Sequence, residues 1–192
     1  MGNQVRGEAF SGHGYGTRRR MLYESAREQI ERSIQSGFYG EAIAQCESIL
    51  ADRLESRLSF LQNKNRGFQT VGKLACDLRS VEKGDETQLL RATVSAVEVW
   101  AQLRNCALHE MVKVADKGPI ADWQDKPTDW EVRTAFLRRI ALLGYELAQH
   151  LYLRVAELNP KHRDRVLPNP ERAIDVVRAD LDSLKREVKD EF

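Results

Sequence analysis

The chain has 192 residues, of which 42% are apolar and 31% are charged, and its formal net charge at pH 7 is +1. This composition excludes a disordered chain, and no apolar run approaches the ~20 residues that a bilayer requires. The near-neutral charge gives no global attraction to nucleic acid, so any such binding must come from a local patch.

The N-terminal twenty residues lack the apolar segment of a signal peptide, which predicts a cytoplasmic protein. The three cysteines show no C-x-x-C spacing, so we expect reduced thiols and neither disulfides nor a metal site; they are Cys46, Cys76 and Cys106. No glycine-rich phosphate loop, zinc-protease helix or serine nucleophile motif is present. We therefore expect no cofactor, no metal and no membrane association.

Apolar residues recur at helical spacing over most of the chain. Residues 1–16 alternate glycine with small polar residues and are expected to be flexible. Asp85 is predicted to cap the fourth helix, and Pro160 to end the fifth. The predicted helices span residues 17–36, 40–63, 68–81, 85–117 and 128–159.

The last part of the chain, residues 161–192, is predicted to be a linker and a C-terminal helix. Asn169 and Pro170 have the sequence of a helix cap followed by proline at the first helical position. Apolar residues then alternate spacings of three and four, as in a coiled-coil seam; they are Ile174, Val177, Leu181, Leu184 and Val188. This helix can dock on its own bundle, dimerise or bind a partner. Two heptads favour docking on the bundle.

The pattern as a whole predicts an all-α fold, because no convincing strand or hairpin signal accompanies the helices. We expect a bundle of about five or six helices over residues 17–160, with an additional amphipathic helix at the C-terminus.

The most informative segment is Arg104-Asn105-Cys106-Ala107-Leu108-His109, in the fourth predicted helix. At about 100° per residue, Arg104 falls within the apolar arc of that helix. Asn105 and His109 lie one turn apart on a flank of this arc, and Lys113 continues the flank.

Glu47 falls inside the apolar stripe of the second predicted helix, so two helices bring ionisable groups onto core-facing surfaces. An arginine in such a place must pair with a carboxylate or bind an anion. One interpretation is a structural Glu47–Arg104 pair with His109 at its boundary. The other is a phosphate clamp beside a general acid or base, since histidine titrates near neutral pH.

The segment from Arg104 to His109 has the form R-N-x-x-x-H and resembles the R-x4-6-H signature of the HEPN superfamily. Residues 42–61 also resemble the long helix that precedes the motif helix in those domains, and the resemblance covers residues 40–153. It implies a HEPN-like bundle that acts as a metal-independent endoribonuclease of the toxin or phage-defence type. It also implies a homodimer in which two motif helices face each other across a basic cleft, with RNA as the substrate.

The same resemblance implies a role for each motif residue. His109 would transfer protons during attack of the RNA 2′-hydroxyl on the adjacent phosphate. Arg104 would hold that phosphate and stabilise its developing charge. Asn105 would orient His109 or contact the phosphate, Glu47 would hold Arg104 in position, and Lys113 would bind RNA.

One departure concerns control by an antitoxin. Some toxins of this superfamily carry a tyrosine two residues after the histidine, which a partner nucleotidyltransferase modifies. Met111 stands at that place here. That form of control is therefore not expected, although another antitoxin or regulatory protein can still be a partner.

The alternative function is a non-catalytic adaptor or regulator of the same fold, similar to the mannitol-operon repressor family. In that case Arg104 and His109 are structural, and the apolar seam of the last helix binds a protein partner. A solvent-open groove at Arg104 and His109 favours catalysis, whereas an Arg104 sealed against Glu47 within one protomer favours the adaptor.

Overall fold

The computed structural model describes residues 15–63, 69–112, 128–158 and 170–191. Six α-helices and one short 3-10 helix lie in these ranges, and no strand is found among them, which confirms the all-α prediction. The elements are α1 (Tyr15–Gln35), α2 (Tyr39–Gln62), α3 (Val71–Val81), η1 (Asp85–Thr87), α4 (Gln88–Val112), α5 (Thr128–Glu157) and α6 (Ile174–Glu191). None of the described helices is long and apolar enough to cross a bilayer.

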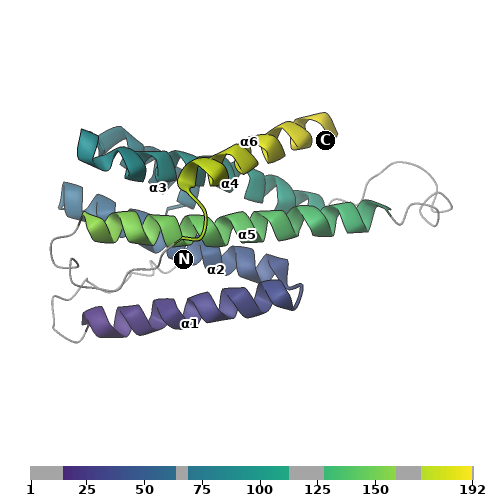
Figure 1. Ribbon diagram of the computed structural model, residues 1–192, viewed down its shortest axis with the longest axis horizontal. Helices are drawn as coiled ribbons and strands as arrows, with labels where there is room; N and C mark the ends of the chain where they lie inside the picture. Colours follow the sequence, from purple (N-terminus) through teal and green to yellow (C-terminus); the bar gives the residue numbers. More distant parts are fainter. Residues whose placement is uncertain (1–14, 64–68, 113–127, 159–169, 192) are drawn as a thin grey trace, which may run out of the picture.

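The long helices lie side by side, with α5 at the centre (Figure 1). Helix α5 packs against both α2 and α4, while α1 covers the side of α2 away from α4. Helices α3 and α6 both pack against α4, so the helix that carries the motif has neighbours on several sides.

The core follows the apolar stripe predicted for α2. Its inward-facing residues recur every three or four positions and are fully buried; they are Ile43, Cys46, Leu50, Leu54 and Leu58. Each fully buried leucine or isoleucine contributes about 1.5–3 kcal/mol through the hydrophobic effect. The helices are therefore held together mainly by this apolar surface.

Helix α1 begins at Tyr15, so the last two residues of the segment 1–16, which was expected to be flexible, are helical. Three other helix starts differ from the sequence predictions by three residues or more. Asp85 does not cap α4, because it opens the 3-10 helix that follows Gly84, and α4 begins at Gln88. Helix α3 begins at Val71, where the Thr70 side chain accepts a hydrogen bond from the Lys73 amide. Pro160 and Asn169 lie outside the described residues.

The start of α6 is the third difference. The helix begins at Ile174, and Pro170 precedes it without being helical. The carbonyl of Ala173 accepts hydrogen bonds from the amides of Val176 and Val177, at 3.0 and 3.2 Å. The backbone therefore supplies the first hydrogen bonds of this helix.

The apolar seam of α6 is buried within the same chain, because the helix packs against α4 and α5. Its buried residues are Ile174, Val177, Leu181 and Leu184. Of the three possibilities that the sequence left open, namely docking on the bundle, dimerisation and partner binding, the structure shows docking on the bundle.

Trp100 on α4 lies directly against Gly144 on α5. The Trp100 side chain is fully buried, and its indole Nε1 donates a hydrogen bond to the carbonyl of Ile140 at 2.9 Å. A Cβ atom built on Gly144 would lie 2.7 Å from Trp100 Cζ2. Glycine is therefore required at this position by the space available.

We expect Gly144→Ala to lower the free energy of unfolding by about 1–3 kcal/mol, because the added methyl group forces the indole out of its place. Gly40→Ala is the matched control, since Gly40 also lies in a helix but has no neighbouring atom within 4 Å of an added Cβ. That change should leave stability unaltered or raise it slightly. Urea denaturation followed by circular dichroism measures both, and equal effects of the two changes would contradict the close approach.

Candidate functional site

Arg104 lies on the inward side of α4, as its register predicts. Two of its neighbours on the helix are buried: Leu103, which precedes it, and Ala107, which lies on the next turn. The Arg104 side chain keeps only 14% of its surface exposed. Such a burial is costly for a guanidinium unless a carboxylate or another anion compensates it.

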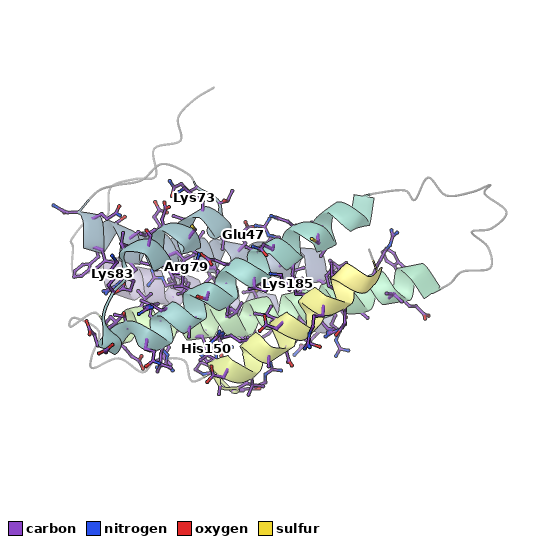
Figure 2. The ribbon with its side chains drawn as sticks, turned by 90° about the horizontal axis from the view of Figure 1, so that it is seen from above. Glu47, Lys73, Arg79, Lys83, His150 and Lys185 are labelled. Carbon is purple, nitrogen blue, oxygen red and sulfur yellow. The ribbon has the colours of Figure 1, made fainter. Side chains whose placement is uncertain are left out.

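That carboxylate is Glu47 on α2, labelled in Figure 2 in the view onto α3, α4 and α6. Arg104 Nη2 donates a hydrogen bond to Glu47 Oε1, which joins the two helices across 57 residues of sequence. The Glu47 side chain is 31% exposed, so the pair lies at the edge of the core and is not sealed from solvent. Arg104 Nε is buried and has no hydrogen-bond partner among the described residues.

The other proposed site residues are described to different extents. Asn105 is exposed on the outer side of α4. His109 belongs to α4 by its backbone, but its side chain lies outside the described residues, as does all of Lys113. The structure therefore brings together Arg104 and Glu47, and the placement of the His109 and Lys113 side chains stays a prediction.

A second arginine pair on α2 was not found from the sequence. Arg57 donates two hydrogen bonds to the carboxylate of Glu82, each at 2.8 Å. Both side chains are more deeply buried than those of the first pair, at 10% and 5% exposed. The helical register of α2 places Arg57 near a margin of its apolar stripe, but no local signal in the sequence points to Glu82, which follows the end of α3.

The other arginine of α2, Arg53, lies against two tyrosine rings. The Arg53 guanidinium carbon is 4.6 Å from the ring centroid of Tyr23 on α1 and 5.5 Å from that of Tyr152 on α5. Asp52 accepts a hydrogen bond from Arg53 Nη2 at 2.6 Å and another from the Tyr23 hydroxyl. This polar cluster joins three helices, and nothing in the spacing of the tyrosines predicted it.

The remaining reactive groups give little support for other chemistry. Burial raises the pKa of the Cys46 thiol well above its ordinary value, so this cysteine is not a ready nucleophile. Within the ranges that the structure describes, no three residues of the types His, Cys, Asp or Glu are grouped as metal ligands.

Comparison of the chain with protein-family models, with curated proteins and with solved structures finds no match.

Removing one partner of the Arg104–Glu47 pair leaves a charge that is largely shielded from water. We expect Glu47→Gln to lower the free energy of unfolding by about 1–3 kcal/mol, less than for a sealed pair because solvent reaches Glu47. In a double-mutant cycle with Arg104→Met, the coupling free energy should reach at least about 1 kcal/mol. Chemical denaturation of the four proteins measures it.

The exposed pair Arg178–Asp175 on α6 is the matched control, with side chains 46% and 84% exposed. Its coupling free energy should stay below about 0.5 kcal/mol. A Glu47–Arg104 coupling as small as this would show that the first pair contributes nothing particular to the fold.

Proposed function

We propose that the chain is a metal-independent endoribonuclease of the toxin or phage-defence type, with its site on α4. The observation that carries this proposal is the placement of Arg104. Its side chain is held by Glu47 at the edge of the core, in a sequence that continues with Asn105 and His109 on the same helix. A planar guanidinium held in one orientation beside a partly exposed carboxylate is suited to contacting a phosphate oxygen.

The position of α6 supports this function over the adaptor. The adaptor requires the apolar seam of the last helix to be available to a protein partner. In the described part of the chain this seam is already buried against α4 and α5. The apolar surface with which an adaptor would bind its partner is therefore already covered by other helices of the same chain.

The proposed reaction needs no metal. A general base removes the proton of the RNA 2′-hydroxyl, and the 2′-oxygen then forms a bond to the adjacent phosphorus. The bond from phosphorus to the 5′-oxygen breaks, and a general acid protonates this leaving oxygen. The products are a 2′,3′-cyclic phosphate and a 5′-hydroxyl, and Arg104 would stabilise the charge that develops on the phosphate oxygens.

In this proposal His109 supplies one of the two proton transfers. A second histidine, from a second copy of the chain, would supply the other, so we propose a homodimer with the RNA between the two motif helices. Asn105 would orient the imidazole or donate to the phosphate, and Lys113 would add a contact to the RNA backbone.

A specific observation favours the second candidate, the non-catalytic adaptor or regulator. Arg104 finds its carboxylate within one protomer, so its burial has a structural explanation that requires no substrate. The pair is only partly buried, and solvent reaches Glu47. This access is what the catalytic proposal requires of the site.

The decisive experiment is cleavage of RNA by the purified chain in the presence of EDTA. We expect products that carry a 2′,3′-cyclic phosphate, detected by mass spectrometry. His109→Ala should lower the rate by about 10²–10⁴-fold, the usual contribution of a general acid or base. Arg104→Lys, which keeps the positive charge opposite Glu47, should lower it by about 10²-fold or more.

Arg178→Ala is the control variant, because Arg178 lies exposed on α6 with a weak ion pair. It should cleave at the wild-type rate, and circular dichroism should show all variants folded. Intact RNA with the folded wild-type dimer, or equal cleavage by His109→Ala, would overturn the catalytic proposal and favour the adaptor.

A further inference from the structure

The start of α6 is attached to α5 through a buried histidine. His150 on α5 is only 3% exposed, and it lies beside the beginning of α6 (Figure 2). Its ring Nε2 is 2.8 Å from the backbone carbonyl oxygen of Arg172, two residues before the helix begins. A carbonyl oxygen can only accept, so Nε2 must carry the proton of the neutral ring.

The other ring nitrogen makes this arrangement sensitive to protonation. His150 Nδ1 is buried and has no hydrogen-bond partner among the described residues. Protonation would place an N–H group and a full positive charge at this unpartnered position. Both are costly in a buried environment. Water would satisfy them once the contact between His150 and the segment before α6, here called the joint, is broken.

The Arg172 side chain completes the joint. Its Nε lies 3.0 Å from Glu146 Oε2 on α5, and its Nη2 lies 2.8 Å from Asp180 Oδ2 on α6. One residue therefore binds both helices through its guanidinium, while its carbonyl binds His150. The segment before α6 is held to α5 at the backbone and at the side chain.

We propose that this joint is a pH-sensitive latch, in which the neutral imidazole of His150 holds α6 against α4 and α5 and its protonation releases the helix. The device is separate from the proposed cleavage chemistry, and it stands whether or not the chain is an enzyme. Because α6 lies along α4 (Figure 1), its release uncovers one side of the helix that carries Arg104.

The charges around the joint determine the direction of the effect. Burial lowers the pKa of His150 below its ordinary value of 6.5, and the nearby charge of Arg154 lowers it further, while the hydrogen bond to Arg172 opposes this shift. No charged group from the described part of α4 contributes to it. The docked state therefore binds fewer protons than the open state, so docking is strongest above pH 6.5 and weakens as the pH falls below it.

Glu146 acts in the opposite sense. Burial raises its pKa above 4.5, against the charge of Arg172, and the charges of Asp180 and Glu171 raise it further. Its protonation relieves the burial of a carboxylate and favours the docked state as the pH falls toward 4.5. The contribution of His150 is therefore best separated from that of Glu146 by comparing pH 7.5 with about pH 5.5.

Hydrogen–deuterium exchange of the full chain tests the latch. Exchange rates of α6 peptides are divided by the intrinsic rates at each pH and compared with those of α2. In the wild type, protection of α6 relative to α2 should fall several-fold from pH 7.5 to about pH 5.5. His150→Gln, whose amide can donate to the Arg172 carbonyl without titrating, should lose this fall and remain protected at both values.

His150→Leu provides a second test, because it removes both the hydrogen bond and the titration. Protection of its α6 should be lower than in the wild type at pH 7.5 and should not change at pH 5.5. Either variant is sufficient, since both lack a titrating imidazole. A wild-type ratio that is equal at the two pH values, or a pH-dependent fall that persists in a folded variant, would overturn the proposal.

Discussion

The arrangement of the bundle depends on the rule that a guanidinium removed from water needs a carboxylate. Helix α2 takes part in two such ion pairs. Its Glu47 pairs with Arg104 on α4, and its Arg57 pairs with Glu82 after α3. Apolar burial supplies most of the stabilisation, but it tolerates small rotations of a helix. The two ion pairs do not, because each guanidinium must meet its carboxylate at hydrogen-bond distance.

The helices could be predicted because their signals are local. The apolar residues of α2 and α5 repeat at 3.6-residue spacing, and the glycine after α1 marks its end. The starts of α4 and α6 were less predictable. Asp85 has the chemistry of a cap, yet the chain forms a 3-10 turn there first, and the favourable Asn-Pro sequence precedes α6 by several residues. Residues that can cap a helix therefore allow a helix to begin at their position but do not require it to begin there.

The candidate site shows a similar division. Contact between Glu47 and Arg104 could be anticipated, because each residue falls within the apolar stripe of a helix and both stripes face one core. The partner of Arg57 could not, since Glu82 lies in a connection that has no periodicity. The same applies to Arg53, whose aromatic neighbours come from α1 and α5. Long-range polar contacts depend on how helices are rotated, which a single sequence does not specify.

The close fit of Trp100 against Gly144 has a consequence for observing this protein in solution. The Trp100 indole is fully buried between α4 and α5, whereas Trp130 is 69% exposed near the start of α5. The chain has a third tryptophan, Trp123. A protein that carries both Trp123→Phe and Trp130→Phe therefore keeps Trp100 as its single tryptophan, and separation of α4 from α5 should red-shift its emission and expose it to quenching by acrylamide. The fluorescence of Trp100 alone then reports whether α4 and α5 are packed against each other.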